Sequence, residues 1–384
     1  MGINMGEKSE KLKRSVVAYT TETDVMKAFE EVCSTIDEAA QGRVPILIIL
    51  LSGIESFALI SKKLNDKYKG ACIIGSTTNV TYGSKGDSEE GVNIVAVFKG
   101  VQCFSGVLLD VKSYPSRYID NITNAVDKLK DYENVVCFQF TTAFSNCEEL
   151  VQDTYRSALL SKNIPIFGGT AGGSYTNEES YVSLNGVIYD EASVFVFIKN
   201  LNGGFHIFKE NIFRPINHTY TATDVDVDER VVYEFNNRPA AQVVAESLHV
   251  SVEELPDRIN MHPVGRIEGD RIYITEADRV NPDLSITFFS RIYNFTEVIQ
   301  LEPDDVHEVW DSTKRDIEEK MKQQEFSIVV NCIVRTNYFK SRELWDEFNG
   351  FLKGSLTNYI GLTGFGENVE FQHLNSTMII LTFE

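Results

Sequence analysis

The sequence predicts an α/β protein of two domains, with mixed parallel and antiparallel sheets built from internally repeated αβαβββ units. Two observations lead to this prediction. Apolar residues at helical spacing alternate with short runs that are apolar on both faces, a pattern typical of helices between buried parallel strands. A Gly-x-Thr sequence also ends the second strand of each repeat, at Gly75, Gly168 and Gly361. Recurrence at this spacing indicates duplication within the chain.

The first repeat begins with a helix predicted over 24–40, where Val25, Phe29 and Val32 recur at helical spacing and Thr23 is the predicted N-cap. The next run is short and wholly apolar, which predicts a buried strand. The elements predicted after the helix are a strand over 44–51, a helix over 55–68, and strands over 71–74, 92–98 and 102–110.

The second and third repeats follow the same order. In the second, Asn185-Gly186 is a type I′ turn signal and predicts a hairpin. Its elements are a helix over 116–129, a strand over 134–140, a helix over 147–160, a strand over 165–167, the hairpin over 182–189, and strands over 194–199 and 205–210. Those of the third are a helix over 304–323, a strand over 326–334, a helix over 341–354, and strands over 357–360 and 377–383.

The stretch from Asp224 to Arg230 interrupts this order. Its alternating aspartates resemble part of a calcium loop but lack the glycine at the sixth position and the distal glutamate, so a strand edge or domain junction is predicted. The predicted organisation is an N-terminal tail over 1–20, one domain over 21–228 and a second over 229–384. Within the second predicted domain, a helix over 240–248 and short strands over 271–275 and 285–289 are expected before the third repeat.

The charge of the chain argues against nucleic acid and anionic membranes as partners. With 36 basic and 56 acidic residues, the formal net charge is −20, and a field of this sign repels phosphate groups. The six cysteines form no C-x-x-C pair and sit mostly in apolar runs, which indicates free thiols in a reducing compartment. The polar N-terminus lacks a signal-peptide core, and no run reaches the roughly 18 apolar residues that span a bilayer. A cytoplasmic protein is therefore predicted.

Glycine-rich turns at strand ends are the first candidate binding elements. The richest follows strand 165–167 and comprises Gly168, Gly169, Thr170, Gly172 and Gly173. Its counterpart near the C-terminus contributes Thr363, Gly364 and Gly366. The first of these turns is not a Walker loop, because no Lys-Ser/Thr follows it, and it is not a good dinucleotide fingerprint, because polar residues and a strand follow it and not a helix. Tight chain reversal and ligand binding through backbone amides both remain open for these turns.

Four further residues are binding candidates near these turns: Cys332, Arg335, Glu367 and Asn375. If the strand runs to Val334, Arg335 leaves its carboxyl end, where a guanidinium can hold a carboxylate or phosphate. The alternative is a surface arginine paired with Glu367 or another acid. Glu367 and Asn375 either line the same binding site as Arg335 or serve as turn residues. Cys332 is either a small buried side chain or a nucleophile.

Catalytic and metal motifs are missing from the sequence. It contains no G-x-S-x-G and no H-E-x-x-H, and the six histidines show no ligand spacing. One histidine is enough for an axial haem ligand, so spacing leaves haem open as a cofactor. The sequence therefore predicts a binding protein that is not an enzyme and has no metal cluster. A hydrolase using Cys332 is the less favoured alternative.

The order of several short motifs resembles the FIST family, whose members have a FIST N and a FIST C part. The motifs are Gly168 to Gly173, the hairpin Val182 to Tyr189, Val232 to Ala240, His262 to Gly265, Cys332 to Arg335, Gly361 to Glu367 and Leu374 to Met378. The resemblance covers about residues 35 to 384 and identifies the two predicted domains with FIST N and FIST C. The chain departs from the family pattern at Gly75 to Asn79.

The resemblance implies a sensory module that binds a small molecule, such as an amino acid or another small anion. Members are fused to or encoded beside histidine kinases, chemoreceptors and cyclic-dinucleotide enzymes, so a separate partner of this kind is expected to carry the output. Some members are haem proteins that respond to nitric oxide, which makes a haem-based gas or redox sensor the main alternative.

Overall fold

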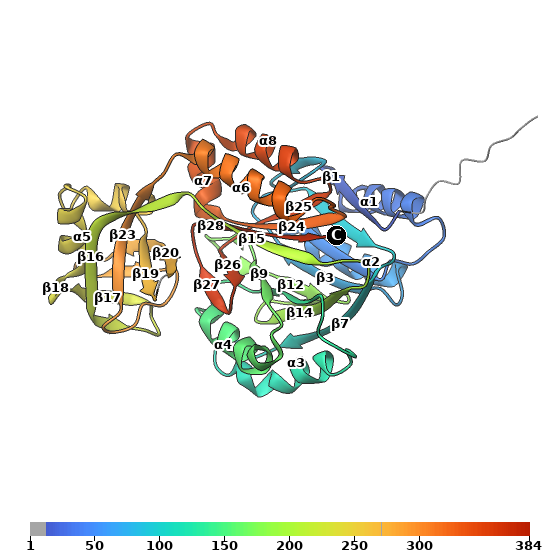
Figure 1. The fold of residues 1–384 in the computed structure, drawn as a ribbon, viewed down its shortest axis with the longest axis horizontal. Coiled ribbons are helices and arrows are strands. Elements are labelled where there is room, and N and C mark those ends of the chain that lie inside the picture. The colour runs from blue at the N-terminus through green and yellow to red at the C-terminus, as the bar shows by residue number, and fades with distance from the viewer. Residues whose placement is uncertain (1–12, 270) are drawn as a thin grey trace, which may run out of the picture.

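The computed structural model describes residues 13–269 and 271–384. Residues 1–12, which include most of the predicted N-terminal tail, lie outside the described residues. The described residues form a body of three helix-covered sheets, with an outer lobe at one end (Figure 1). No described helix combines the length and the apolar character needed to cross a membrane.

The body consists of three consecutive units with one element order, an edge strand followed by the predicted helices and strands. The first comprises β1 Ser15–Thr20, α1 Val25–Ala40, β2 Leu47–Ser52, α2 Ile54–Lys67, β3 Cys72–Thr77, β4 Thr81–Gly83, β5 Gly86–Ser88 and β6 Val92–Val97. The second comprises β7 Val101–Leu108, η1 Pro115–Tyr118, α3 Ile119–Val126, β8 Val135–Thr141, α4 Glu148–Leu159, η2 Leu160–Lys162, β9 Ile166–Thr170, β10 Gly173–Ser174, β11 Glu179–Ser180, β12 Val182–Leu184, β13 Val187–Tyr189 and β14 Ser193–Asn200.

The third unit is interrupted after its first strand by the outer lobe. It comprises β15 Phe205–Asn211 and then α6 Val306–Lys320, β24 Phe326–Cys332, α7 Ile333–Ser341, α8 Trp345–Ser355, β25 Tyr359–Gly364, β26 Gly366–Val369, β27 Gln372–Leu374 and β28 Thr377–Phe383. The lobe comprises β16 Phe213–Asp226, β17 Val231–Phe235, β18 Arg238–Pro239, α5 Ala240–Ser247, η3 Leu255–Asp257, η4 Ile259–Met261, β19 Val264–Glu268, β20 Arg271–Thr275, β21 Ala277–Val280, β22 Ile286–Phe288 and β23 Glu297–Pro303. Its strands form one mainly antiparallel sheet.

Each unit completes the sheet of another unit. The three sheets have the orders β1-β6-β2-β3-β12-β13, β7-β14-β8-β9-β26-β27 and β15-β28-β24-β25-β4-β5. The central pairs β2/β3, β8/β9 and β24/β25 are parallel, and each is extended by a hairpin from another unit. This cyclic exchange pairs the backbone groups on the free edge of every parallel pair. It also brings the ends of β3, β9 and β25 toward one another.

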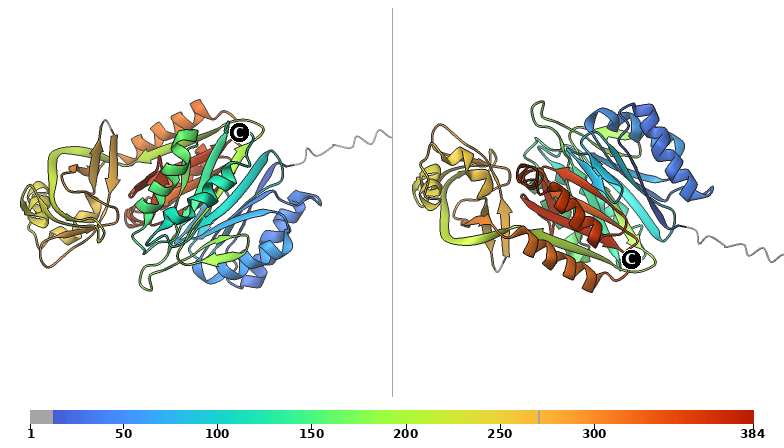
Figure 2. Two further views of the ribbon diagram at one scale, coloured as in Figure 1. Left: turned by 90° about the horizontal axis from the view of Figure 1, so that it is seen from below. Right: turned by 90° about the horizontal axis from the view of Figure 1, so that it is seen from above.

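The three sheets share one central core. Their inward faces contribute Ile49, Phe138 and Val330, among others, to a single buried apolar cluster. Their outward faces are covered by α1 and α2, by α3 and α4, and by α6 to α8 (Figure 2). Burial on both faces explains why these strands are continuously apolar. The predicted fold class, mixed α/β with repeated units, is confirmed.

Several element boundaries differ from the expectations. Ser15–Thr20, predicted as tail, form β1 and pair with β6. The N-cap of α1 is Asp24 and not Thr23, because its carboxylate accepts hydrogen bonds from the amides of Met26 and Lys27. The long strand β16 was missed. The predicted boundary between 228 and 229 falls at the turn from β16 to β17 inside the lobe, and a division of the chain at that point stays a prediction.

The strand predicted over 326–334 ends earlier, at Cys332, and α7 follows directly. The side chains of Asn331 and Thr336 both donate to the carbonyl oxygen of Cys332, at 3.4 and 3.2 Å, and Asn331 also donates to Thr336 at 2.9 Å. These bonds satisfy the carbonyl oxygen of Cys332, the last residue of the strand, with side-chain donors, and the helix begins at the next residue. Arg335 therefore belongs to the first turn of α7.

Candidate functional site

The three Gly-x-Thr strand ends meet in a ring of backbone hydrogen bonds. The carbonyl oxygen of each threonine accepts a bond from an amide in the turn of another unit. Gly172 donates to Thr77 at 3.0 Å, Phe365 to Thr170 at 3.1 Å, and Asn79 to Thr363 at 3.1 Å. Each donor lies two residues after the threonine of its own turn. The convergence of the three turns expected from the sequence is thus present.

Two glycines make this close approach possible. A Cβ atom at Gly172 would lie 2.4 Å from the carbonyl oxygen of Thr363, and one at Gly364 would lie 2.1 Å from that of Thr170. Real side chains do not tolerate such distances to backbone atoms, so only glycine fits here. These glycines act as contact points between turns.

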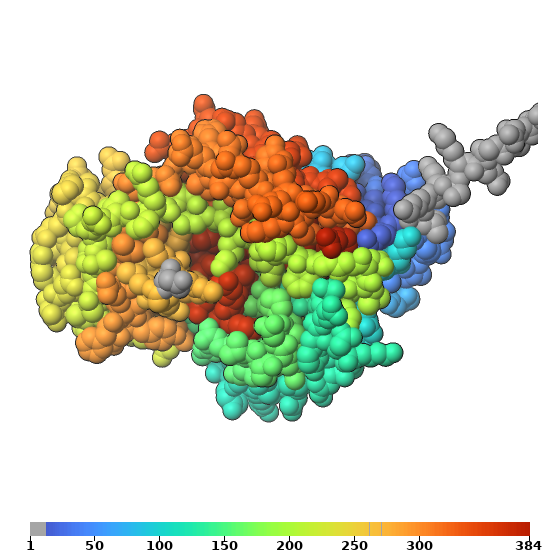
Figure 3. Space-filling view, viewed as in Figure 1, coloured from blue at the N-terminus to red at the C-terminus, as the bar shows by residue number. Residues whose placement is uncertain are grey.

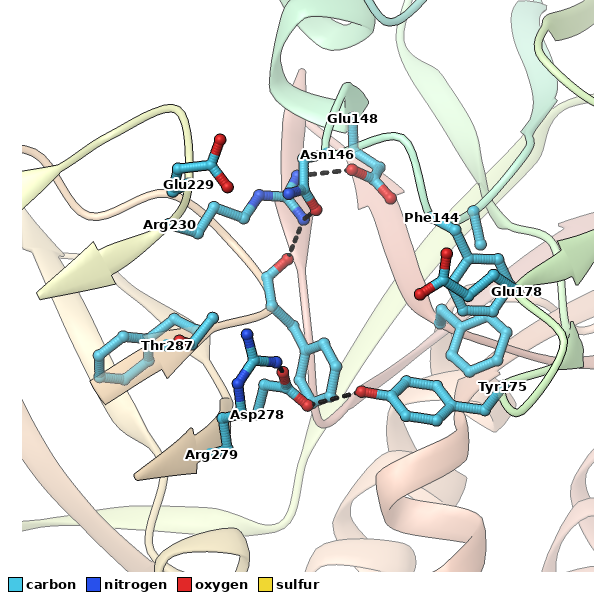
Figure 4. A pocket seen from close by; sticks show the side chains of 14 residues that line it. Phe144, Asn146, Glu148, Tyr175, Glu178, Glu229, Arg230, Asp278, Arg279 and Thr287 are labelled. Carbon is cyan, nitrogen blue, oxygen red and sulfur yellow. Dashed lines mark hydrogen bonds and ion pairs between the residues drawn. The ribbon is translucent and has the colours of Figure 1, made fainter. Parts of the chain in front are cut away.

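A cleft lies where this ring faces the outer lobe. Its first part, the polar compartment, has a volume of about 220 Å³ and is walled by both the body and the lobe (Figure 4). Four carboxylates and two guanidinium groups line it, from Glu148, Glu178, Glu229, Asp278, Arg230 and Arg279. The body contributes Asn146 and Glu148 from the β8–α4 connection, and the lobe contributes Arg230 from the β16–β17 turn.

The second part, the apolar compartment, has a volume of about 670 Å³ and adjoins the first. It is lined from the body by Ile333, Val334, Asn337 and Tyr338 of α7 and by Asn79 of the first turn. Both compartments share the walls Tyr175, Asp278, Phe289 and Phe365. A small molecule with a polar end and an apolar body can therefore contact both sides at once.

Three aromatic rings from separate segments cluster at the polar compartment. Phe144 lies 4.9 Å from Phe365 and 6.0 Å from Tyr175, centroid to centroid, in edge-to-face arrangements. Tyr175 follows the second glycine-rich turn, and Phe365 lies within the third, between Gly364 and Gly366. The backbone of Phe144 is left-handed, with φ of 66°, and Asn146 in the same connection has φ of 48°. Such backbone costs about 1 to 2 kcal/mol for residues other than glycine and is concentrated at functional sites.

Lobe and body are joined by buried ion pairs and hydrogen bonds in addition to apolar contacts, since Tyr273 of the lobe also belongs to the central apolar cluster. The Nη2 atom of Arg230 contacts Glu148 at 2.5 Å and Glu149 at 2.6 Å, and its Nη1 donates to the carbonyl oxygen of Phe289 at 2.6 Å. Burial alone would raise the pKa of Glu149, but the charge of Arg230 lowers it to about 2. Glu149 therefore stays ionised in this buried pair.

Further bonds cross the junction deeper inside. Ser290 donates to Asn375 Oδ1 at 3.0 Å, the Arg291 amide donates to Glu149 at 2.7 Å, and Ser376 donates to Glu276. At the cleft itself, Tyr175 of the body donates to Asp278 of the lobe at 2.7 Å. Interfaces between units of one chain are commonly of this partly polar kind. Figure 3 shows a hollow between the lobe and the C-terminal part of the body.

The twelve site residues predicted from the sequence gather around the ring, but none is among the described residues that line the two compartments. Gly168, Gly169 and Thr170 lie in β9, and Thr363 and Gly364 end β25. The residues that line the cleft are their neighbours: Asn79, Tyr175, Ile333, Val334 and Phe365. A ligand role for the twelve residues stays a prediction.

Arg335 does not extend into the cleft as expected. It is fully buried, its Nη2 forms an ion pair with Glu210 of β15, and its Nε donates to Asn331 at 3.0 Å. The early start of α7 turns the side chain back toward the sheet. The alternative of pairing with Glu367 or another acid is met by Glu210, but the pair is buried and not on the surface.

Glu367 and Asn375 are buried polar residues beside the ring. Glu367 accepts bonds from the amide and hydroxyl of Thr377, and burial raises the pKa of its carboxyl to about 8. Asn375 accepts from Ser290 across the lobe junction. The contact of Asn375 therefore lies in the junction between body and lobe, whereas that of Glu367 lies within the body.

Cys332 is buried with 1% of its surface exposed. Burial raises the pKa of its thiol far above the usual range, and the nearby carboxyl of Glu367 raises it further. A nucleophilic cysteine requires the opposite shift, toward the thiolate. The site therefore supplies no activated thiol at Cys332.

We expect the native protein to react slowly with a thiol reagent at pH 7.5. Burial raises the pKa of Cys33 and of Cys72 to about 11, and the thiolate fraction falls about tenfold for each unit. Labelling of any site should be roughly 100-fold slower than that of free cysteine, while denaturant should expose all six thiols. Mass spectrometry locates the label, and a rapid reaction at Cys332 would restore the hydrolase alternative.

The described histidines do not provide a haem ligand in this cleft. No histidine or cysteine is found among the described lining residues of either compartment. His373, the histidine nearest the ring in sequence, is buried against Gly366, and its Nδ1 lies 3.0 Å from Asn368 Oδ1. Within the described residues, no group of three or more histidine, cysteine or acidic side chains is arranged to hold a metal ion.

Comparison with known families finds two matches that together cover most of the chain. The FIST N domain matches residues 46–238, and the FIST C domain matches residues 240–371. No protein of curated function matches the sequence. Among solved structures, the chain is similar to a cyanuric acid hydrolase described as an evolutionary innovation by structural concatenation. That similarity has 10% sequence identity and a TM-score of 0.34 over 97% of this chain and 100% of that one, and nothing is carried over from it.

Proposed function

The chain belongs to the FIST family of sensory domains that bind small ligands, and we propose that it binds its ligand in the cleft between the body and the outer lobe. In this proposal the protein is a signal-transduction module and not an enzyme. Its output passes to a separate protein, such as a histidine kinase, a chemoreceptor or a cyclic-dinucleotide enzyme.

One observation supports this site above all. The lobe and the body wall the same cleft, and the Tyr175–Asp278 hydrogen bond crosses it at 2.7 Å. A ligand that enters the cleft contacts both units and competes with or adds to this bond. Such a ligand has different contacts in different lobe positions, which is the requirement for shifting their populations.

The chain connections are suited to this movement. The described chain passes between body and lobe at the β15–β16 step and at the β23–α6 step. Beside apolar contacts such as those of Tyr273 and Ile274, the junction contains hydrogen bonds and ion pairs that can exchange partners when the lobe moves. A ligand-dependent change in lobe position is therefore the proposed signal.

A thermal-shift screen with amino acids, organic acids and amines tests the proposal. A ligand at 100 times its Kd should stabilise the protein by about 2.7 kcal/mol. The predicted ligands, an amino acid or another small anion, are included in the same screen. Small-angle X-ray scattering with and without the hit should show a change in the radius of gyration.

Phe365→Ala is the diagnostic variant, because Phe365 lines both compartments. We expect it to weaken binding at least tenfold. Phe295→Ala is the matched control, since Phe295 belongs to the lobe, is 79% exposed and is not among the lining residues. A hit that binds Phe365→Ala as tightly as the unchanged protein would exclude this cleft as the site.

A further inference from the structure

We propose, on the basis of the ligand site proposed above, that the ligand is an organic ammonium compound with an apolar body. Its ammonium group would lie against Asp278 and the rings of Phe144, Tyr175 and Phe365. Its apolar body would enter the compartment lined by α7. This assignment replaces the small anion expected from the sequence by a cation.

The charge of the polar compartment favours a cation. Its four lining carboxylates outnumber its two guanidinium groups, which leaves a formal charge of 2 − 4 = −2. The net charge of the chain, −20, has the same sign. An anionic ligand would be repelled both on approach and in the cleft, whereas a cation would be attracted.

Arg230, the strongest candidate for holding an anion, is already occupied. Its guanidinium is buried between Glu148 and Glu149 and also donates to the carbonyl oxygen of Phe289. Two carboxylates compensate its single charge. Moving it onto a ligand would leave the buried Glu148 without this cation and Glu149 with only the longer 3.9 Å pair to Arg291, which costs several kcal/mol. Anion binding through Arg230 is therefore disfavoured.

Asp278 is the carboxylate that remains available. It lines both compartments, so it lies at the boundary between the polar and apolar parts. One of its oxygens accepts from Tyr175 at 2.7 Å, and the other pairs with Arg279, whose side chain is 62% exposed. The Asp278 side chain is 14% exposed, so the guanidinium can return to solvent at little cost while the carboxylate keeps a need for a cation. An ammonium group can take the place of Arg279 and retain the Tyr175 bond.

The aromatic rings supply the second part of an ammonium site. Ring faces attract cations within about 6 Å of the centroid, and clusters of aromatic rings are used to bind ammonium groups. Phe144, Tyr175 and Phe365 lie within 6.2 Å of one another, and all three line the compartment that holds Asp278. The strained backbone of Phe144 holds its ring against this group.

Four compounds with the same phenyl body separate the contribution of the charged group from that of the apolar body, with binding measured by isothermal titration calorimetry at pH 7. They are 2-phenylethylamine, 2-phenylethanol, 3-phenylpropionate and phenylalanine. We expect the amine to bind at least tenfold more tightly than the alcohol and the propionate. Phenylalanine, which adds a carboxylate to the same amine, should bind more weakly than 2-phenylethylamine.

Asp278→Asn tests the proposed counter-charge. It should weaken amine binding at least tenfold and leave alcohol binding unchanged. Glu253→Gln is the matched control, because it removes one exposed carboxylate from the same lobe outside the lining residues. It should bind the amine as the unchanged protein does. Amine binding that is insensitive to Asp278→Asn would overturn the assignment.

The outcomes distinguish the two proposals. If the propionate or phenylalanine binds as tightly as the amine and Phe365→Ala abolishes that binding, the ammonium assignment is overturned and the ligand site stands. If none of the four compounds binds and the wider thermal-shift screen also gives no hit, both are overturned.

Discussion

Arg335→Met is expected to lower the free energy of unfolding by about 3 to 5 kcal/mol. Arg335 and Glu210 form a fully buried ion pair, with 0% and 1% of their side chains exposed. Removing the guanidinium leaves the Glu210 carboxylate inside the body without its cation, and Glu210 Oε2 already has no hydrogen-bond partner in the described structure. A buried charge without compensation costs far more than the pair itself contributes.

A double variant and a surface control separate this effect from lost packing. Arg335→Met combined with Glu210→Met removes both charges and should recover most of the stability, since apolar pairs replace buried ion pairs at little cost. Arg342→Met removes an exposed arginine just after the same helix and should change stability by less than about 0.5 kcal/mol. Chemical unfolding midpoints provide the comparison. Equal stability of Arg335→Met and Arg342→Met would contradict the burial seen here.

The repeated units could be predicted because their signals are local. Continuous apolar runs marked strands such as β2 and β24, and Asn185-Gly186 marked the β12–β13 turn, where φ is 50° and 79° as a type I′ turn requires. The family resemblance rested on the same local motifs. The identity of each hairpin's partner sheet is a contact between distant residues, and no local pattern encodes it.

The candidate site could be predicted only in part, because some of its features are local in sequence and others are contacts between distant residues. The strand-end turns were correctly expected to meet, since strand ends of α/β units collect at one edge. The lining residues were missed because Phe144, Tyr175 and Phe365 are isolated aromatic residues in three separate segments. Their meeting depends on the ring of turns and on the lobe, whose strands carry weaker patterns. The sequence signal that could have identified Phe365 was its position directly beside the glycines of the third turn.

Arg230→Met is expected to release the lobe from the body as well as to destabilise the protein. Arg230 is 5% exposed and is the lobe cation that faces Glu148 and Glu149 of the body. Its loss leaves Glu148 without this cation and Glu149 with Arg291, whose Nε lies 3.9 Å away, and we expect about 3 to 5 kcal/mol of destabilisation. The backbone of Arg230 is left-handed, with φ of 57°. Methionine is also unbranched at Cβ, so the change leaves that strain unaltered.

Hydrogen exchange shows which part of the structure loosens. Amides at the junction, in residues 273–276 and 289–291, should exchange faster in Arg230→Met, whereas the central strands β2, β8 and β24 should not. Arg258→Met, which removes an exposed arginine from the same lobe, is the control and should leave both groups unchanged. Protection of the junction in Arg230→Met equal to that of the control would contradict its role in positioning the lobe.

The triple variant Arg230→Met, Glu148→Gln, Glu149→Gln separates stability from lobe position. With these three buried charges removed, and with Arg291 still paired with Asp228, it should regain most of the unfolding free energy. The bonds that Arg230 makes to the body are still missing, so the junction amides should stay weakly protected. Because the proposed signal is a change of lobe position, this variant should also show a larger radius of gyration without ligand. A triple variant with a fully protected junction would mean that the deeper bonds, such as Ser290 to Asn375, fix the lobe.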